Sequence, residues 1–336
     1  MRPALKVSGN HFSLSRSYAA TLDGLLPRRK RRPQENADLA YTAQKVFEDV
    51  LVEFLTSAHK RWGGENLIFT GGCALNSSAN GKILSSTPFR SLHVPMAPGD
   101  NGNSIGAALL AWQAAHPEKQ VPRYGSPYLG SELPQEALVR LRTYGVDPCF
   151  SAENPDHLAD FVAGELAAGA IVGWMQGRAE FGHRALGNRS ILADPRPPGI
   201  RDRLNASVKF SEEFRPFAPS ILHEFGPEYF EDYTASPYME KTLKWRPGLA
   251  PAGVRHADDT GRLQSVTHEG NPLFHKLISA FHRKTGLPIL LNTSFNVMGR
   301  PMVHDIEDAL GVFFTSDLDL LVLGNTAFRK RSRAPG

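Results

Sequence analysis

Two apolar segments, each followed by a glycine-containing loop and a helical pattern, most constrain the fold of this chain. The first such unit spans residues 67–84 and turns at Gly71 and Gly72, and the second follows at once over residues 92–115. Strands that alternate with helices, with loops at the strand ends, are typical of an α/β domain that binds a ligand at those loops. We therefore predict an α/β fold.

The length of 336 residues exceeds what one hydrophobic core usually serves, so we expect two domains. A long amphipathic helix is predicted from Ala43 to Ala58, with Gly63 and Gly64 ending it. Later helices are predicted at residues 134–143, 155–168, 274–281 and 306–314, and later strands at residues 170–175, 288–291 and 318–323. The expected parts are an irregular N-terminal segment at residues 1–36, a first α/β part at 37–116, a linker at 117–150 and a second α/β domain at 151–330.

The composition excludes several classes of protein. The chain is 41% hydrophobic and 21% charged, as in ordinary globular proteins. Cys73 and Cys149 are too few for a disulfide framework or a multi-cysteine zinc site, and they suit a reducing cytoplasm. No apolar run approaches the roughly 18 residues of a membrane span. The net charge of +4 lies largely in two basic patches without aromatic stacking residues, which argues against nucleic-acid binding.

The run at residues 177–190 is the densest in reactive side chains. Arg178, Arg184 and Arg189 stand among glycines, with His183 between them, directly after an apolar segment. An arginine fork matches carboxylate and phosphate oxygens, and glycine lets backbone N–H groups approach the same oxygens. The run predicts an anion-binding site; the alternative is a surface arginine cluster that pairs with nearby acids.

Further cations and polar groups lie downstream of this run. Lys209, Arg215 and Arg262 are cationic candidates, and two prolines stiffen the backbone around Arg215. Ser294 and Asn296 follow a predicted buried strand. Their hydroxyl and carboxamide groups suit a sugar, a base or a carbamoyl amide.

The first half of the chain offers two weaker candidates. Gly71, Gly72 and Asn76 either hold a phosphate at a helix N-terminus or simply form a tight turn, and both interpretations stay open. Asp100 either reaches a metal or a phosphate-bound cation, or caps the helix near Ser104. No Walker loop, dinucleotide fingerprint or Ser-His-Asp pattern is present.

Taken together, these motifs resemble one known family. The runs at residues 177–194, 214–219 and 291–296 resemble the C-terminal domain of the O-carbamoyltransferases of nodulation and of antibiotic tailoring, a branch of natural product biosynthesis. Residues 71–76 and 99–102 resemble the same family. The resemblance covers most of the chain.

This resemblance implies a specific fold and activity. Residues 37–116 would form the second half of a Kae1-like domain of the actin/Hsp70 superfold, and residues 151–330 a YrdC-like α/β domain. In the family, the YrdC-like domain makes carbamoyl-adenylate from ATP and carbamoyl phosphate, with Mg²⁺ on the nucleotide. The Kae1-like domain passes the carbamoyl group to a hydroxyl of a small-molecule acceptor, with a metal such as Fe²⁺ in its cleft.

The resemblance also assigns roles to residues. His183 either shuttles a proton or donates a hydrogen bond. The implied catalytic residues are Arg178, His183, Arg184, Lys209 and Arg215. The implied nucleotide and carbamoyl contacts are Arg189, Arg262, Ser294, Asn296, Gly71, Gly72 and Asn76. The implied metal ligand is Asp100.

The chain departs from the family pattern at two places. Ser211 stands where the Lys-x-Arg signature has arginine, and the His-x-x-x-His metal pair of the Kae1-like domain is absent, since His11 and His59 have the wrong spacing. We therefore expect full activity to need a separate N-terminal half or a homo-oligomer. A catalytically inactive nucleotide- or RNA-binding module with a YrdC-like surface is the alternative, and a purely structural partner subunit is a third interpretation.

Overall fold

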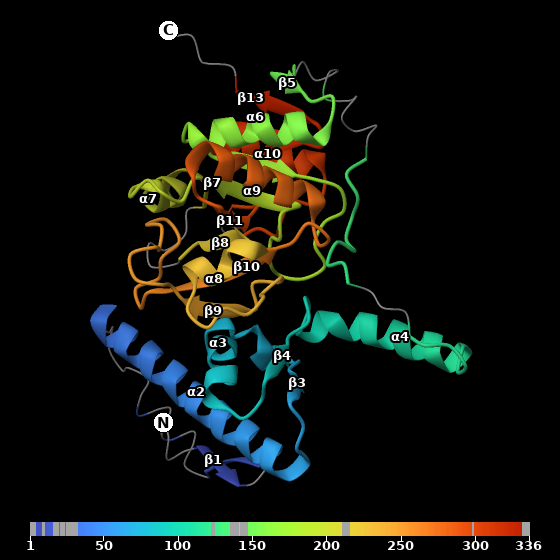
Figure 1. Cartoon of the computed structure of the whole chain (residues 1–336), viewed down its shortest axis with the longest axis vertical. Helices are drawn as coiled ribbons and strands as arrows, with labels where there is room; N and C mark the ends of the chain where they lie inside the picture. The colour runs from blue at the N-terminus through green and yellow to red at the C-terminus, as the bar shows by residue number, and fades with distance from the viewer. Residues whose placement is uncertain are drawn as a thin grey trace. The chain divides into compact units, whose positions relative to one another are not determined.

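The chain forms two compact units, Met1–Val94 and Pro95–Gly336 (Figure 1). The computed structural model describes residues 5–8, 11–15, 20, 24, 33–121, 125–134, 141, 147–209, 216–297 and 299–330. Arg215 and Ser211, both singled out in the sequence, lie outside the described residues, as does most of the helix predicted at residues 134–143.

The N-terminal unit is built around one long helix, α2 (Pro33–Trp62). The predicted stop is confirmed, because the chain leaves the helix at Gly63, where φ is +69°. Leu51 and Leu55 of α2 pack with Ile83 and Phe89 in a small core. The other elements are β3 (Asn66–Ile68), the 3₁₀ helix η2 (Gly72–Leu75), α3 (Ser77–Ser86) and β4 (Ser91–His93), and β3 pairs with β4 in parallel.

The first residues are not uniformly irregular, and the expectation for residues 1–36 is wrong in this respect. Strands β1 (Leu5–Ser8) and β2 (His11–Leu14) form an antiparallel pair, and α2 already begins at Pro33. The sequence signal was present: a Gly-Asn pair separates two runs of alternating apolar residues, which favours a hairpin. Proline suits the first turn of a helix, where its missing N–H costs no hydrogen bond.

A mixed sheet organises the C-terminal unit. Among the described residues it has nine strands in the order β5-β13-β12-β6-β7-β11-β8-β10-β9. Their bounds are β5 (Phe150–Ser151), β6 (Val172–Met175), β7 (Arg189–Ala193), β8 (Ala218–Leu222), β9 (Lys241–Lys244), β10 (Thr260–Val266), β11 (Ile289–Ser294), β12 (Leu320–Leu323) and β13 (Thr326–Arg329). The strands predicted near β6, β11 and β12 are confirmed.

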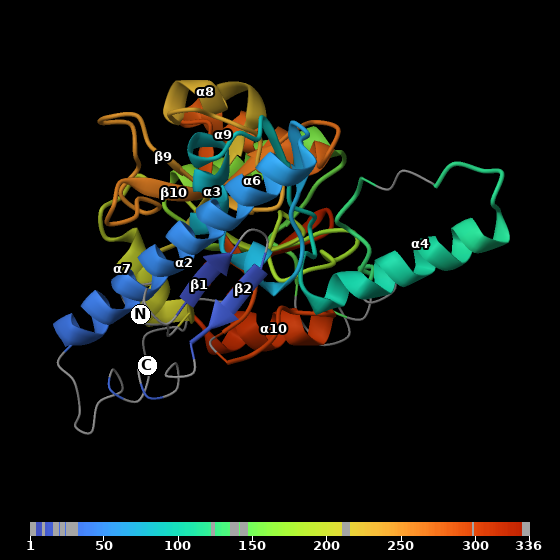
Figure 2. The same ribbon diagram turned by 90° about the horizontal axis from the view of Figure 1, so that it is seen from below.

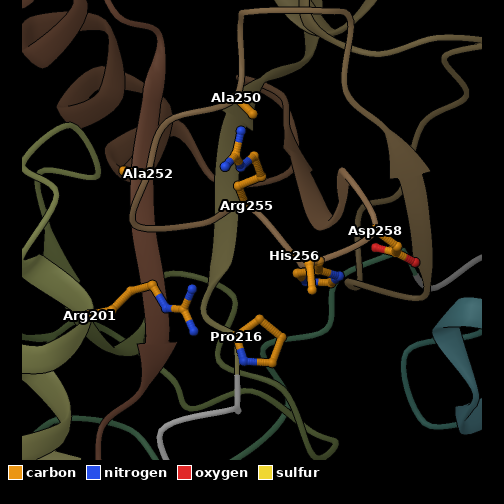
Figure 3. Close-up of a pocket in the computed structure, with 8 residues that line it drawn as sticks. Arg201, Pro216, Ala250, Ala252, Arg255, His256 and Asp258 are labelled. Carbon is orange, nitrogen blue, oxygen red and sulfur yellow. The ribbon is translucent and has the colours of Figure 1, made fainter. Parts of the chain in front are cut away.

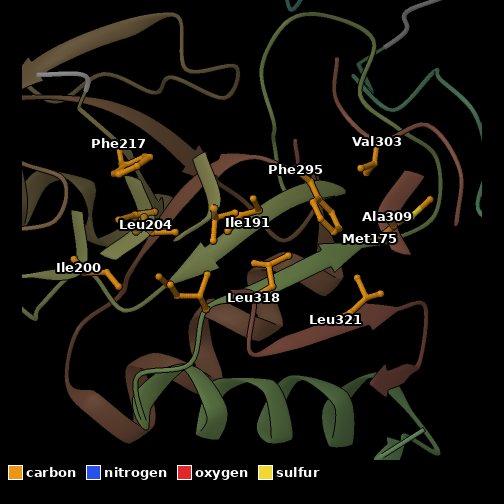
Figure 4. Close-up of a cluster of buried hydrophobic side chains, with 14 of the residues drawn as sticks. Met175, Ile191, Ile200, Leu204, Phe217, Phe295, Val303, Ala309, Leu318 and Leu321 are labelled. Carbon is orange, nitrogen blue, oxygen red and sulfur yellow. The ribbon is translucent and has the colours of Figure 1, made fainter. Parts of the chain in front are cut away.

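Helices cover both faces of this sheet, with α6 (Pro155–Ala167) and α9 (Pro272–Thr285) packed together on one face. The opposite face is covered by α7 (Ile200–Leu204) and α10 (Ile306–Thr315) (Figure 2). Figure 4 shows part of the core beneath the second pair, to which Leu204 of α7, Phe295 just after β11 and Leu321 of β12 contribute. The remaining elements are the 3₁₀ helices η3 (Asp100–Gly102) and η5 (His223–Phe225), α4 (Asn103–Ala115), the π-helix η4 (Asn205–Lys209) and α8 (Gly226–Tyr229).

The mixed α/β prediction therefore holds. None of the helices among the described residues combines the length and the apolar character that crossing a membrane requires. The sheet face beside α9 also carries buried polar residues, among them Ser220, Gln264 and Asn292, and the candidate site lies at these residues.

Candidate functional site

The loop at residues 181–189 joins β6 to β7 and is folded around a buried carboxylate. The Oε1 atom of Glu180 accepts the backbone N–H groups of Leu186 at 2.7 Å, Asn188 at 2.8 Å and Arg189 at 3.3 Å. Burial raises the pKa of Glu180, and these N–H groups oppose the shift. These backbone N–H groups, which the sequence suggested for an external anion, therefore bind the chain's own carboxylate.

Arg189 also stabilises the loop, because its side chain donates hydrogen bonds to backbone carbonyls. Its Nη1 donates to the carbonyls of Gln176 at 2.6 Å and Asn188 at 2.9 Å, and its Nη2 to those of Ser131 at 3.1 Å and Gly177 at 3.2 Å. The residue is fully buried at the start of β7. Both amino groups of the guanidinium are thus engaged by backbone carbonyls, an arrangement that fixes the base of the loop.

Arg178 points to a different neighbour. Its Nη2 donates to the carbonyl of Leu129 at 3.1 Å, and its Nη1 lies 4.0 Å from the carboxylate of Glu132. The side chain is 53% exposed. Here the structure matches the alternative interpretation of the sequence, a surface arginine beside an acid.

Arg184 and Arg262 come from distant parts of the chain and lie close enough for the charge of Arg262 to act on Arg184. The Nε atoms of both side chains are buried, and neither has a hydrogen-bond partner within the described part of the chain. Burial and then Arg262 lower the pKa of Arg184 to about 9, and burial lowers the pKa of Arg262. Two neighbouring guanidinium groups with orphaned donors are suited to an anion.

His183 lies beside this pair. Burial, then Arg184 and Arg262, lower the pKa of His183 to about 4, so the imidazole is neutral at pH 7. A neutral imidazole donates one hydrogen bond and accepts another. The two positive neighbours make it a weak base, which favours the hydrogen-bonding role over the proton-shuttle role.

Three buried polar side chains form the floor beneath the loop. The Ser220 Oγ donates to Gln264 Oε1 at 2.6 Å, and Asn292 Nδ2 donates to Ser220 Oγ at 3.0 Å. Gln264 Nε2 donates to the Leu186 carbonyl at 2.8 Å, and Asn292 Nδ2 also lies 3.3 Å from the Ala185 carbonyl. This polar floor holds the loop over strands β8, β10 and β11.

The floor explains why Arg262 meets Arg184. Arg262 precedes Gln264 by two residues on β10, and residues two apart in a strand share a face. The loop that Gln264 holds carries Arg184. Sequence reasoning missed Ser220 and Gln264, and it included Asn292 only as part of the run at residues 291–296. A polar residue within an otherwise buried strand is the signal that would have found Ser220 and Gln264.

Lys209, Ser294 and Asn296 meet at the end of β11. The Lys209 Nζ donates to Ser294 Oγ at 3.0 Å, to the Ser294 carbonyl at 2.7 Å and to Asn296 Oδ1 at 2.5 Å. Burial lowers the pKa of Lys209 to about 7. Ser294 lies about 7 Å along the same face of β11 from Asn292, so this cluster adjoins the floor.

The lowered pKa of Lys209 predicts a pH dependence of stability. The unfolded chain keeps this proton up to an ordinary pKa of 10.5, whereas the folded chain releases it near pH 7. The free energy of unfolding should therefore rise between pH 7 and pH 10, by up to about 1.4 kcal/mol per pH unit from this group. Urea unfolding of Lys209→Met should lack that rise, whereas Lys244→Met, at an exposed lysine, should keep it. Parallel pH curves for wild type and Lys209→Met would contradict the shift.

A cavity of about 630 Å³ opens near Arg262, within the range of small-ligand pockets. It is lined by Arg201, Pro216, Ala250, Ala252, Arg255, His256, Ala257 and Asp258. Figure 3 shows Arg201 reaching from α7 toward Pro216 and the segment that carries His256. Burial lowers the pKa of His256. The charge of Asp258 opposes this shift, whereas the charges of Arg262 and Arg201 add to it. No motif in the sequence pointed to this cavity.

The candidates of the N-terminal unit have structural partners of their own. Asn76 caps α3, because its Oδ1 accepts the Ala79 N–H at 3.0 Å, and its Nδ2 donates to Gln44 Oε1 at 2.9 Å. Gly71 and Gly72 precede this cap and form a tight turn into the 3₁₀ helix η2. The N-terminus of α3 is therefore already capped by a side chain of the protein, that of Asn76.

Asp100 stands at the first position of η3. It does not cap α4, whose N-cap is Gly102 without a side-chain cap bond, so that alternative is wrong. Among the residues that the structure describes, no group of three or more His, Cys, Asp or Glu side chains could hold a metal ion. The described residues alone therefore do not form an iron site.

Comparisons with known proteins agree with these motifs. The family models described as "Carbamoyltransferase N-terminus" and "Carbamoyltransferase C-terminus" match residues 13–109 and 163–330. Nodulation protein NolO of Bradyrhizobium diazoefficiens is 40% identical, over 97% of this chain and 61% of that protein. The 3'-hydroxymethylcephem-O-carbamoyltransferase of Amycolatopsis lactamdurans is 33% identical, over 80% of this chain and 49% of that protein.

A solved structure, full-length HypF in the phosphate- and nucleotide-bound form, aligns with a TM-score of 0.36 and 20% identity over 55% of this chain and 22% of that chain. The chain spans about three-fifths of the length of NolO and about half of the length of the 3'-hydroxymethylcephem-O-carbamoyltransferase. The C-terminal family match alone covers half of the chain and contains Arg184, Lys209, Arg262 and Ser294. The chain belongs to the carbamoyltransferase family.

Proposed function

We propose that this chain is an O-carbamoyltransferase whose C-terminal unit activates a carbamoyl group with ATP. The observation that carries the proposal is the buried pair of Arg184 and Arg262, each with an unpartnered Nε donor among the described residues. Buried charges of like sign are costly unless an anion offsets them. Phosphate and carbamate groups supply that anion.

The proposed activation step joins carbamate to AMP. Water hydrolyses carbamoyl phosphate to carbamate and inorganic phosphate, and a carbamate oxygen then attacks the α-phosphorus of ATP. A new O–P bond forms, the bond from the α-phosphorus to the oxygen bridging it to the β-phosphorus breaks, and pyrophosphate leaves. Negative charge on the phosphate oxygens is neutralised by Arg184 and Arg262, which are already in place before the reaction. Mg²⁺ bound to the triphosphate would neutralise part of the same charge.

The neighbouring groups have supporting roles in this proposal. Neutral His183 donates a hydrogen bond to a phosphate or carbamate oxygen. Lys209 holds Ser294 and Asn296 at the strand end, where they orient the carbamoyl amide. The cavity beside His256 is large enough for part of the nucleotide.

The transfer step completes the proposed reaction. The acceptor hydroxyl attacks the carbamoyl carbon, loses its proton, and AMP leaves with the bridging oxygen. We propose a hydroxylated small molecule as the acceptor. A separate N-terminal half or a second copy of the chain is part of this proposal, as the family resemblance implies.

ATP binding tests the first requirement of the proposal. In isothermal titration calorimetry, Arg184→Ala should weaken ATP binding by about 10- to 100-fold, because a charge-assisted hydrogen bond inside a desolvated site is worth ~1.5–3 kcal/mol. Arg178→Ala, at the exposed arginine of the same run, should change it less than about threefold. Equal weakening by both variants would contradict the assignment to Arg184, and no ATP binding by the wild type would favour a purely structural subunit.

A further inference from the structure

Residues 125–134, which the sequence suggested as part of an interdomain linker, run alongside residues 177–181, which lead into the loop at residues 181–189. The Phe181 N–H donates to the Pro127 carbonyl at 2.6 Å, and the Leu133 N–H donates to the Gly177 carbonyl at 3.0 Å. Between them, the Gly130 N–H donates to the Ala179 carbonyl at 2.9 Å. The pairing is antiparallel, and we call residues 125–134 the strap.

The contact between the strap and residues 177–181 is tight at one point. A Cβ atom added at Gly130 would lie 2.9 Å from the Ala179 Cβ and 3.0 Å from the Ala179 carbonyl oxygen. Only glycine therefore allows the strap to approach this closely. The Ser131 carbonyl also accepts the Ala179 N–H at 2.8 Å and an Nη2 donor of Arg189 at 3.1 Å.

One side chain of the strap reaches farther, to the part of the loop next to Arg184. The Tyr128 hydroxyl donates to the Leu186 carbonyl at 2.9 Å and accepts a hydrogen bond from Asn271 Nδ2 at 2.8 Å. Asn271 is the N-cap of α9, because its Oδ1 accepts the Phe274 N–H at 3.0 Å. Tyr128 thus connects the fixed start of α9 to a carbonyl two residues beyond Arg184.

The Leu186 carbonyl is clamped from two sides. Gln264 Nε2 donates to it from the floor at 2.8 Å, and the Tyr128 hydroxyl donates to it from the strap at 2.9 Å. The Leu186 side chain is buried with Ala218 and Met239. Two donors and a packed side chain leave this point of the loop little freedom, and Arg184 extends from the same turn.

We infer that the strap is a positioning element of the anion site, and that Tyr128 acts through the Leu186 carbonyl to hold Arg184 where it meets the substrate. The inference rests on the proposed function for the identity of that substrate. The positioning of the loop itself can be measured without any substrate.

A double-mutant cycle on ATP binding separates positioning from general support of the fold. Tyr128→Phe should weaken ATP binding by about tenfold in the wild-type background and by less than about twofold in Arg184→Ala, because coupled residues are not additive. Tyr229→Phe, the same chemical change at another tyrosine of the C-terminal unit, should have no effect in either background. Additive losses in Tyr128→Phe and Arg184→Ala would overturn the inference.

Hydrogen exchange supplies the second measurement, which needs no ligand. In Tyr128→Phe and Gly130→Ala, the backbone amides of Leu186, Asn188 and Arg189 should exchange faster than in Tyr229→Phe, while amides of β11 keep their protection. Unchanged exchange in both strap variants would overturn the inference even if ATP binds. If the wild type binds no ATP, the proposed function fails, and the exchange rates alone decide whether the strap positions the loop.

Discussion

Replacing Arg262 with alanine is expected to lower the rate of pyrophosphate formation from ATP and carbamoyl phosphate by about 100- to 1000-fold, the usual cost of removing one preorganised donor to a developing negative charge. Arg262 has a buried Nε without a partner within the described residues, as Arg184 and Arg189 do. Arg189 differs from the other two because its Nη atoms already bind backbone carbonyls. Arg262→Lys keeps the charge but loses the planar fork, so about a tenfold or larger loss should remain.

The Arg262→Ala variant should be at least as stable as the wild type although it loses activity. Burial disfavours the charged form of Arg262, which is why its pKa is lowered, and Arg184 adds like-charge repulsion. Removing one charge relieves both, so the thermal unfolding temperature of Arg262→Ala should stay the same or rise. Arg283→Ala, at an exposed position on α9, is the matched control and should change neither quantity. If the activity of Arg262→Ala stayed within about threefold of the wild type, the assignment of Arg262 to the active site would be contradicted.

Replacing Glu180 with alanine is expected to cost on the order of 3–5 kcal/mol of unfolding free energy, because each buried donor left without an acceptor costs ~1–3 kcal/mol. Three backbone N–H groups lose their acceptor in this variant. Glu180→Gln keeps an oxygen at the Oε1 position and should cost only about 1 kcal/mol. Urea unfolding measures both variants.

The control for Glu180 is Glu153→Ala, at a carboxylate that is 84% exposed. It should change the unfolding free energy by less than about 0.5 kcal/mol. If Glu180→Ala were as stable as Glu153→Ala, the loop at residues 181–189 would not depend on the buried carboxylate. The structural role of the glycine-rich run would then need another explanation.

Much of the fold of the C-terminal unit could be predicted because its central segments are simple. Strands β6, β11 and β12 are short apolar runs, and α9 has apolar residues at helical spacing. Strands β7, β8 and β10 were missed because each contains buried polar residues, such as Ser190, Ser220 and Gln264, that break an apolar run. The polar residues that build the site are therefore also the ones that make these three strands hard to predict from the sequence.

The candidate site was predictable in its charges but not in its pairings. Lys209 and Ser294 were separate candidates, and the structure joins them by a hydrogen bond of 3.0 Å. The three arginines of the run at residues 177–190 have different roles: Arg184 lies near Arg262, Arg189 binds backbone carbonyls, and Arg178 reaches Leu129 and Glu132. Sequence shows that a guanidinium is present, whereas its partner depends on strand order and on which face of the sheet it occupies.

The measurement that tests the central claim most directly is carbamoyl phosphate-dependent incorporation of labelled pyrophosphate into ATP by the purified chain. Reversible formation of a carbamoyl-adenylate predicts label in ATP that requires carbamoyl phosphate, persists in Arg178→Ala, and is lost in Arg184→Ala and Arg262→Ala. ATP binding without any such exchange would contradict the account and leave the chain as an inactive nucleotide-binding module.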